Sequence, residues 1–322
     1  MSSKIKAGVI GAGYLGKIHL RLINESSLYD LIGFYDNDKK SSKKLSKEFG
    51  YTLFNSIEEL IESCEMIDII TPTSSHYEIA CQCIKSNKHV FIEKPITDSV
   101  ENANELVRLA DIYKIKGQVG HVERFNPAFI AVKNIIENPK FIETHRLAEF
   151  NPRGTDVPVV LDLMIHDIDI ILSVVKSKVI TISAAGISVI SKTPDIANAR
   201  LEFENGCVAN LTASRISLKN MRKSRFFQNN AYISVDFLSK SVEVVKMKEA
   251  PSNPEEFAII LQNAEGKKKQ IYFNSPIIGS SNAILEELNS FAVSINNNLE
   301  TQVTFKQASE ALRIAHLIIN SF

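Results

Sequence analysis

The hydrophobic positions in the first third of the chain alternate between short apolar runs and helical spacing. Ile5 to Ile10 is rich in β-branched residues and predicts a strand, whereas Leu15 to Ile23 has apolar residues at helical spacing. This alternation continues to about residue 121 and predicts a doubly wound parallel sheet. The other expected strands are Leu31 to Tyr35, Tyr51 to Phe54, Ile67 to Ile70, Val90 to Ile92 and Gln118 to Val122. The other expected helices are a lysine-rich helix after Asp36 with a solvated face, Ile57 to Ile61 behind a Ser56 cap, Ser75 to Lys85 and Val100 to Tyr113.

The pattern changes after residue 121. Short runs joined by polar turns such as Glu204-Asn205-Gly206 predict a large, open, mostly antiparallel sheet. The expected strands are near 141–150, 179–189, 197–203, 207–215, 230–237, 242–247, 257–263 and 268–273, and the expected helices are near 127–137, 159–174, 282–293 and 305–319. We therefore predict an N-terminal Rossmann domain, residues 1–121, and a C-terminal α+β substrate domain, residues 122–322.

Composition narrows the classes of function. Lys plus Arg equals Asp plus Glu at 37 each, so no electrostatic argument favours a nucleic acid or an acidic membrane as partner. The sequence has no apolar stretch approaching the roughly 20 residues that span a bilayer and no signal-peptide core, so we expect a cytoplasmic protein. The four cysteines lack metal-ligand spacing, and we expect them to be reduced and structural, with a catalytic thiol as the alternative.

The glycine turn Gly11-Ala12-Gly13-Tyr14-Leu15-Gly16 lies between the first predicted strand and helix. Such a turn lets the backbone approach a pyrophosphate at a helix N-terminus. Asp36, the twentieth residue after Gly16, ends the next strand, where a carboxylate accepts bonds from ribose hydroxyls and repels a 2′-phosphate. We therefore favour NAD over NADP, although Lys39 and Lys40 lie close enough to soften this preference. The alternative is a glycine turn that only packs tightly.

A polar segment follows the strand Ile67 to Ile70 at the same edge of the sheet. In Thr71-Pro72-Thr73-Ser74-Ser75-His76 the hydroxyls either cap the next helix or bond to the cofactor. Capping is the better interpretation for Ser74 and Ser75. His76 fits equally well as a cofactor contact and as a satisfied histidine at a helix start.

Glu93-Lys94-Pro95 closes the next strand, and Pro95 prevents the ladder from continuing beyond Lys94. A lysine held at this edge, beside a bound nicotinamide, can donate to a substrate oxygen and stabilise negative charge. The alternative is a surface salt bridge between Glu93 and Lys94. That pairing is geometrically poor, because adjacent strand residues point to opposite faces.

Asp162 and His166 are four residues apart on a predicted helix and hence on one face. A carboxylate that fixes the tautomer of an imidazole is the usual arrangement of a general base near neutral pH. Asp167 and Asp169 make the segment acidic, so the alternatives are a capping and solvated acidic face or a metal site. The seven histidines are scattered, and we predict no metal.

Taken together, these motifs resemble the Gfo/Idh/MocA family of nicotinamide-dependent oxidoreductases, and the resemblance covers essentially the whole chain. It implies that Lys94, Asp162 and His166 are catalytic. It also implies a homodimer or homotetramer built through the C-terminal sheets. The residues that it places at or near the cofactor are Gly11, Gly13, Tyr14, Leu15, Gly16, Asp36, Thr71, Pro72, Thr73, His76, Glu93 and Lys94.

A narrower resemblance comes from Gly120 to Pro127 and from Asp162 to Asp169. Both segments are similar to the subgroup of UDP-N-acetylglucosamine 3-dehydrogenases, which oxidise the sugar 3-hydroxyl of a nucleotide sugar. This implies that His121, Glu123, Arg124 and Asn126 border the substrate and that Arg153, on the loop from Asn151 to Asp156, meets a phosphate. The alternative for Arg124 is an ion pair with Glu123 or with a carboxylate of the adjoining domain. Met164 stands where many family members have glycine, and we expect it to narrow the substrate site.

The resulting hypothesis is a dehydrogenase that transfers a hydride between NAD and a hydroxyl carbon of a sugar or nucleotide sugar. Two rivals of other classes are an NAD-dependent glycosidase of the same fold and a nonenzymatic, NAD-sensing regulator. The pair Lys94 and His166 argues against the regulator, which has no need of it. The sequence leaves the dehydrogenase and the glycosidase as alternatives.

Overall fold

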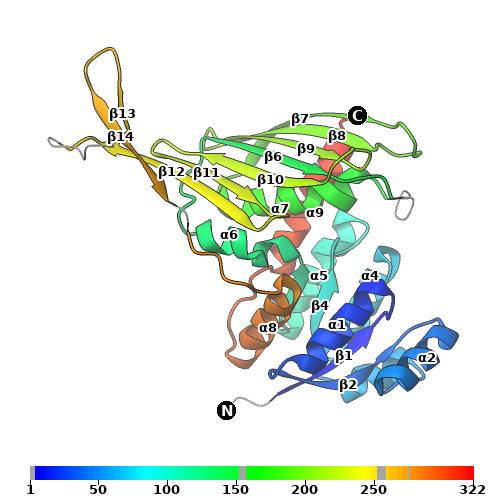
Figure 1. Cartoon of the computed structure of the whole chain (residues 1–322). Coiled ribbons are helices and arrows are strands. Elements are labelled where there is room, and N and C mark those ends of the chain that lie inside the picture. The colour runs from blue at the N-terminus through cyan, green and yellow to red at the C-terminus, as the bar shows by residue number, and fades with distance from the viewer. Residues whose placement is uncertain (1–3, 152–156, 252–258, 275) are drawn as a thin grey trace. The chain divides into compact units, whose positions relative to one another are not determined.

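The computed structural model describes residues 4–151, 157–251, 259–274 and 276–322 (Figure 1). The chain divides into two compact units. One contains residues 1–125 and 282–313, and the other contains residues 126–281 and 314–322. The sequence pattern placed a single boundary at residue 121, whereas in the structure the chain returns to the first unit near its C-terminus.

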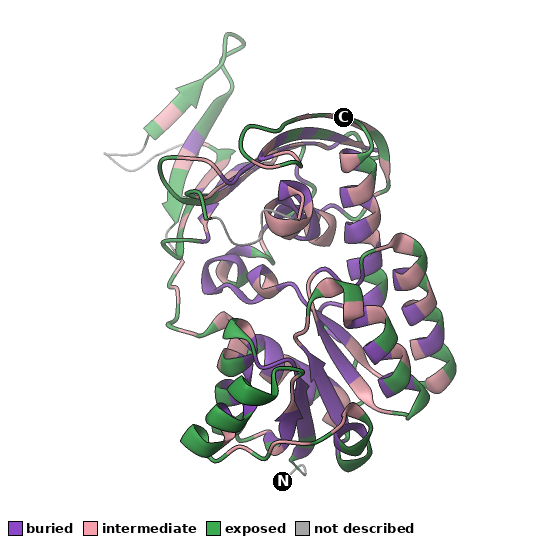
Figure 2. Ribbon diagram, turned by 90° about the vertical axis from the view of Figure 1, so that its right-hand side faces the viewer, coloured by how far each residue is buried: buried purple, intermediate pink, exposed green. Residues whose placement is uncertain are grey.

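The first unit is built on a five-stranded parallel sheet with strand order β2-β1-β3-β4-β5. Its central strands are buried, as Figure 2 shows, because helices supply the crossover connections of a parallel sheet and cover its faces. The strands are β1 (Ile5–Ile10), β2 (Tyr29–Tyr35), β3 (Met66–Ile69), β4 (His89–Glu93) and β5 (Gly117–Gly120). The predicted strand near Tyr51 is reduced to one parallel bridge, between Leu53 and Phe34.

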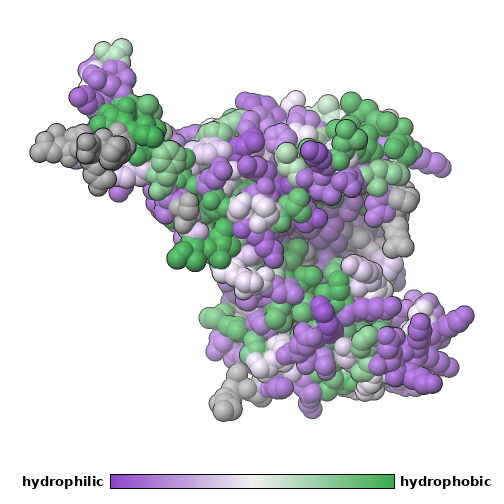
Figure 3. All heavy atoms as spheres, in the orientation of Figure 1, coloured by the Kyte–Doolittle hydropathy of each residue, from purple (hydrophilic) through white to green (hydrophobic). Residues whose placement is uncertain are grey.

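Four helices of the first unit, α2, α3, α5 and α8, begin at a polar residue whose side chain caps them. Ser56 Oγ accepts a bond from the backbone N–H of Glu59 at 3.2 Å, which confirms the predicted cap, and Asp38 caps the lysine-rich helix. In that helix the buried residues are Ser42 and Leu45, so its lysines form the predicted solvated face, seen as a hydrophilic surface at the lower right of Figure 3. The helices are α1 (Tyr14–Glu25), α2 (Lys39–Phe49), α3 (Ile57–Ser63), η1 (Thr73–Ser75), α4 (His76–Lys85), α5 (Val100–Tyr113), η2 (Val122–Phe125) and α8 (Ala283–Asn296).

The helix α8 completes the core of the first unit from the far end of the sequence. Leu288, Phe291 and Ala292 are fully buried in the same cluster as residues of β1 and β2. The Phe291 ring lies 6.0 Å from the ring of Phe91 in β4, and the Tyr29 hydroxyl donates to the Leu288 carbonyl at 2.6 Å. These contacts, one of them between residues 259 apart in sequence, explain why α8 belongs to this unit.

The second unit is built on a nine-stranded sheet with order β13-β14-β12-β11-β10-β6-β9-β8-β7. All neighbouring pairs are antiparallel except β6 and β9, which confirms the predicted open, mostly antiparallel sheet. Side chains alternate between a buried and a more exposed face, as in β6 and β8. The strands are β6 (Phe141–Leu147), β7 (Val179–Ile187), β8 (Ile196–Phe203), β9 (Val208–Ser214), β10 (Met221–Phe227), β11 (Ala231–Asp236), β12 (Ser241–Glu249), β13 (Ile259–Gln262) and β14 (Lys268–Asn274).

The remaining helices are α6 (Pro127–Val132), the π-helical turn η3 (Val160–Met164), α7 (Ile165–Val174) and α9 (Phe305–Ile319), whose last turns belong to the second unit. The predicted helix near 159–174 is therefore one helical stretch with a widened first turn. The strand β10 was not predicted, and α6 is shorter than expected. Among the described residues, no helix is both long and apolar enough to cross a membrane.

Candidate active site

The glycine turn joins β1 to α1 at the carboxyl edge of the parallel sheet. Gly11 has a φ of +99°, in the left-handed region, and its N–H donates to the Tyr35 carbonyl at 2.9 Å. A side chain on Gly16 would overlap the carbonyl oxygen of Gly11. Packing alone therefore requires glycine at these two positions.

Gly13 is different, because a side chain there would meet no atom within 4 Å. Gly13 is exposed and occupies the N-cap position of α1, so no side chain caps this helix. The next two residues, Tyr14 and Leu15, are exposed and half-buried. The first N–H groups of a helix have no partner within it and attract anions. A close-packing explanation thus fails for Gly13, and the approach of a dinucleotide pyrophosphate at this residue stays a prediction.

Asp36 connects the end of β2 to the glycine turn. Its Oδ2 accepts from the Ala12 N–H at 2.6 Å, and its Oδ1 accepts from the Asp38 N–H at 2.8 Å. The carboxylate is half-buried and fixed in the position expected for a ribose contact. Lys39 lies with Nζ 4.5 Å from the centroid of the Tyr35 ring and donates to the Asn55 carbonyl at 3.2 Å.

The His76 ring contacts both the loop after β3 and the turn after β4. It is 1% exposed, and its Nδ1 lies 3.0 Å from the Pro95 carbonyl and its Nε2 2.9 Å from the Thr71 carbonyl. Burial lowers the pKa of His76, although the bonds to these carbonyls oppose the effect. The geometry supports a structural role for His76, and its contact with a cofactor stays a prediction.

The hydroxyl of Ser75 does not cap α4, contrary to prediction. It donates to the Pro72 carbonyl at 2.8 Å, and its oxygen lies 2.7 Å from Thr71 Oγ1, which is placed to share a hydrogen bond with it. Ser75 already has a near-helical backbone in η1, so it lacks the extended conformation of a capping residue. Together these bonds fix the conformation of the Thr71 to Ser75 loop at the edge of the sheet.

Lys94 follows β4 and is half-buried, and a cis peptide bond joins it to Pro95. Glu93 Oε2 accepts from the backbone N–H of Lys94 at 3.0 Å. The carboxylate therefore contacts the main chain of the next residue and fixes the position of the lysine at this edge of the sheet.

Two ionisable residues behind Glu93 were missed from the sequence. His19 on α1 and Asp68 in β3 are both fully buried, and His19 Nδ1 lies 2.9 Å from Asp68 Oδ2. The available signal was a single polar residue flanked by apolar ones in each element, as in Ile67-Asp68-Ile69.

The predicted substrate residues divide between the two units. His121, Glu123 and Arg124 belong to the first, where His121 and Glu123 are buried. Asn126 begins the second unit, and its amide oxygen accepts from the Ala128 N–H at 3.1 Å while its nitrogen donates to the Phe237 carbonyl at 3.0 Å. Asn126 is thus the cap of α6, and its substrate contact stays a prediction. Arg153 lies outside the described residues.

In the second unit, Asp162 lies in the π-turn η3 and His166 in the first turn of α7, and both are half-buried. Single π-turns inside helices are frequent at functional sites. Lys94 belongs to the first unit, so the action of these three residues on one substrate stays a prediction.

The residues around His166 are not a solvated acidic face. Asp167 is 2% and Asp169 1% exposed, and both carboxylate oxygens of Asp167 accept from the buried Arg146 guanidinium at 2.9 Å. This bidentate pair anchors α7 to β6. Met164 is also fully buried and contributes to packing, and its effect on the width of a substrate site stays a prediction.

The cysteines are free thiols. Burial raises the pKa of Cys64 to about 12 and that of Cys207 to about 11, so neither ionises near neutral pH as a nucleophile requires. Within the described part of the chain, no group of three or more His, Cys, Asp or Glu residues could hold a metal ion.

Comparisons with known proteins agree with this geometry. The chain is 32% identical to UDP-N-acetylglucosamine 3-dehydrogenase from Acidithiobacillus ferrooxidans over 74% of its length and 76% of that protein. A solved structure of that enzyme matches 99% of this chain and 98% of its own, with a TM-score of 0.88 and 26% identity. Inositol 2-dehydrogenase from Rhizobium meliloti is 22% identical over 98% of this chain and 96% of its own.

Two family models match, one to each part of the chain. Residues 5–121 match the oxidoreductase family with an NAD-binding Rossmann fold, and residues 139–232 match the GFO/IDH/MocA C-terminal domain. The first match contains the glycine turn, Asp36 and Lys94, and the second contains Asp162 and His166. This chain is therefore a member of the Gfo/Idh/MocA family of oxidoreductases.

Proposed function

We propose that this chain is an NAD-dependent dehydrogenase that oxidises a hydroxyl of a sugar or nucleotide sugar, with the 3-hydroxyl of a UDP-N-acetylhexosamine as the first candidate. The observation that supports NAD binding is the space around Gly13, where a side chain would meet no atom within 4 Å, at the start of a helix without a side-chain cap. The substrate class rests on the 32% identity to a UDP-N-acetylglucosamine 3-dehydrogenase.

Lys94, Asp162 and His166 carry the proposed chemistry. A bound nicotinamide ring supplies the hydride acceptor. The Lys94 ammonium donates to the reacting oxygen and stabilises its negative charge, and His166 accepts the hydroxyl proton at a ring nitrogen. Asp162 orients this imidazole from four residues away. The alcohol thus becomes a carbonyl, having lost one proton to His166 and one hydride.

The direct test follows NADH absorbance across a panel of free and UDP-linked sugars, with product masses measured in the same samples. We expect NADH and a product two mass units lighter than a UDP-linked sugar. Free sugar without net NADH would instead identify the glycosidase. A protein that binds NAD but forms no product, and whose NAD affinity is unchanged by the loss of His166, would be the regulator.

The preference for NAD over NADP rests on Asp36. Its fixed carboxylate can accept from ribose hydroxyls and would repel a 2′-phosphate. The nearby cation, Lys39, is directed at the Tyr35 ring and the Asn55 carbonyl, where it has two partners of its own.

Asp36→Ser is expected to lower the ratio of kcat/KM for NAD to that for NADP about 10- to 100-fold, because it removes both the ribose acceptor and the repelling charge. Initial rates with each cofactor measure the ratio. The matched control is Asp38→Ser, which removes the neighbouring carboxylate that caps α2. An unchanged ratio in Asp36→Ser would show that this carboxylate does not discriminate between the cofactors.

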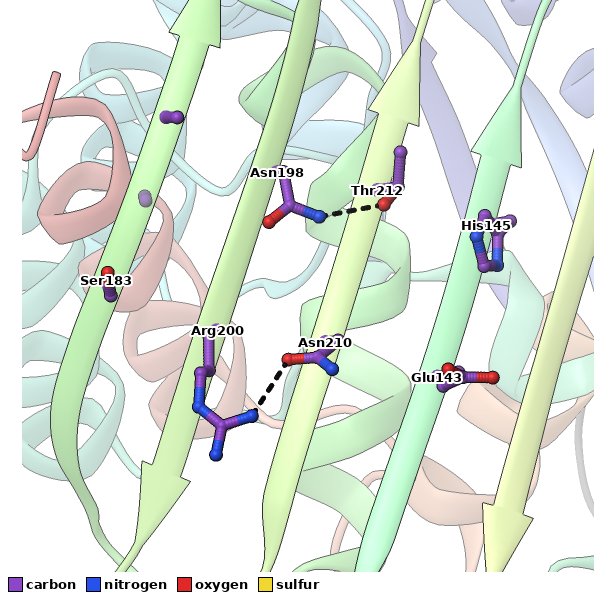
Figure 4. A pocket seen from close by; sticks show the side chains of 9 residues that line it. Glu143, His145, Ser183, Asn198, Arg200, Asn210 and Thr212 are labelled. Atoms are coloured by element: carbon purple, nitrogen blue, oxygen red, sulfur yellow. Dashed lines mark hydrogen bonds between the residues drawn. The ribbon is translucent and has the colours of Figure 1, made fainter.

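We also propose that the chain forms a homodimer or homotetramer through the more exposed face of the second sheet. This face carries polar residues on alternate positions of neighbouring strands, including Asn198, Arg200 and Asn210 (Figure 4). Asn198 donates to Thr212 at 2.9 Å and Arg200 to Asn210 at 3.5 Å, so the face is an ordered polar surface.

Light scattering is expected to give two or four times the mass of one chain. Arg200→Glu should shift the mass toward that of the single chain, because a two-fold contact places the change on both sides of the interface. The control is Arg108→Glu, an exposed arginine on α5. A single-chain mass for the unmodified protein would contradict the proposal.

A further inference from the structure

A buried row of ionisable side chains lies behind Lys94. His19 is midway along α1, and its Nδ1 lies 2.9 Å from Oδ2 of Asp68. Its other ring nitrogen, Nε2, lies 3.6 Å from Oε1 of Glu93. The ring packs edge-on against Phe91, with centroids 5.9 Å apart, which fixes its plane. One imidazole therefore spans two carboxylates from the neighbouring strands β3 and β4.

The half-buried Glu93 carboxylate has two further close neighbours. Its Oε2 accepts from the Lys94 backbone N–H at 3.0 Å. Gly120 is its neighbour in β5, and a side chain on Gly120 would lie 2.8 Å from Glu93 Oε1. Glycine at this position thus leaves the space that the carboxylate occupies. Glu93 thereby links the His19 imidazole to the main chain of Lys94.

The charges in this row favour an imidazolium. Burial alone lowers the pKa of His19, but the charge and hydrogen bond of Asp68, together with the charge of Glu93, outweigh burial and raise it. The charged groups that act on His19 are these two carboxylates. Burial raises the pKa of Glu93, and the charges of His19 and Lys94 oppose that rise. A neutral imidazole has one N–H and can donate to only one of the two carboxylates, whereas an imidazolium has an N–H directed at each of them.

We propose that His19 is a positively charged positioning residue, which bridges Asp68 and Glu93 and so holds the Glu93 carboxylate against the backbone of Lys94. The inference rests on the proposed function in one respect, the catalytic role of Lys94. Without the positive charge, the buried Asp68 and the half-buried Glu93 lose their shared partner, and Glu93 takes up a proton or turns away. The Lys94 main chain then loses its acceptor, and the ammonium loses its fixed direction.

The charge of His19 can be tested without any substrate. Nitrogen-15 spectra of histidine-labelled full-length protein distinguish doubly protonated from neutral rings. At pH 7 we expect His19 to be doubly protonated, with its signal assigned by its loss in His19→Gln. His89 is the internal control, because burial lowers its pKa and Lys116 donates its backbone N–H to the ring Nδ1. A neutral His19 ring at pH 7 would overturn the proposal.

Kinetics test the positioning role. His19→Gln places a neutral donor toward Glu93, and His19→Asn places one toward Asp68. We expect kcat to fall about 10- to 100-fold in both, as for other residues that orient a catalytic group, with the NAD dissociation constant within about threefold. Asp68→Asn should lower the pH at which the His19 ring loses its second proton, which a purely steric role would not do.

The two proposals fail in different ways. If the unmodified protein contains a charged His19 but forms no NADH with any sugar, the dehydrogenase assignment is wrong and the charge assignment holds. If the unmodified protein turns over and both His19 variants keep its kcat, the positioning role is overturned. The spectra of the unmodified protein decide the charge even if a variant fails to fold.

Discussion

Lys94→Met is expected to lower kcat about 1000-fold while leaving the NAD dissociation constant within about threefold. The ammonium is the group proposed to stabilise charge on the reacting oxygen, and removal of a preorganised donor typically costs this much. The proposed cofactor-binding residues, by contrast, are those of the glycine turn and Asp36, which the substitution does not touch. Methionine retains most of the length and apolar volume of the lysine stem, so the half-buried position stays filled.

Stopped-flow or steady-state NADH absorbance gives kcat, and calorimetric titration gives the dissociation constant. Lys85→Met, at the exposed end of α4, is the matched control and should retain full activity. A Lys94→Met protein with an unchanged kcat on the correct substrate would remove Lys94 from the mechanism. A loss confined to NAD affinity would make it a cofactor ligand instead.

Gly13→Ala is expected to raise the NAD dissociation constant at least about tenfold while lowering Tm by no more than about 3 °C. Nothing in the protein lies within 4 Å of the new methyl group, and the backbone at Gly13 has a φ of −65°, which alanine adopts readily. The small stability cost is that of alanine at a helix start. The affinity is lost because the methyl group occupies the space into which a pyrophosphate approaches.

Gly16→Ala is the contrasting variant. Its methyl group would overlap the backbone of Gly11, so it should lower Tm markedly even without cofactor. Thermal unfolding with and without NAD, together with calorimetric titration, separates the two effects. Unchanged NAD affinity in Gly13→Ala would rule out close approach of the cofactor at that residue.

Local patterns were sufficient to predict most of the first unit. The strand Ile5–Ile10 has the predicted bounds because a buried parallel strand is a continuous apolar run. The strand β10 was missed because polar residues, Arg222 and Ser224, share the face of the buried Phe226, so its start shows no alternation of apolar and polar residues. The widened turn η3 was also missed, because one apolar stretch fits both α and π geometry.

The parts of the candidate site that could not be predicted depend on contacts distant in sequence. Asp36 and the glycine turn were placed together because a known spacing links them. The pair His19 and Asp68 is separated by 49 residues, and each looks like an isolated polar residue in an apolar element. The burial of Met164 likewise could not be read from the sequence, because it depends on the packing of the second unit.

The late return of the chain to the first unit has a consequence for biosynthesis. Tyr29 and Phe91 emerge from the ribosome long before the helix that packs against them, Ala283–Asn296. Part of the apolar core of the first unit therefore stays exposed on the nascent chain until the second sheet and α8 have been synthesised. A fragment ending at residue 125 should accordingly aggregate or engage chaperones, and truncation alone cannot yield a minimal cofactor-binding module.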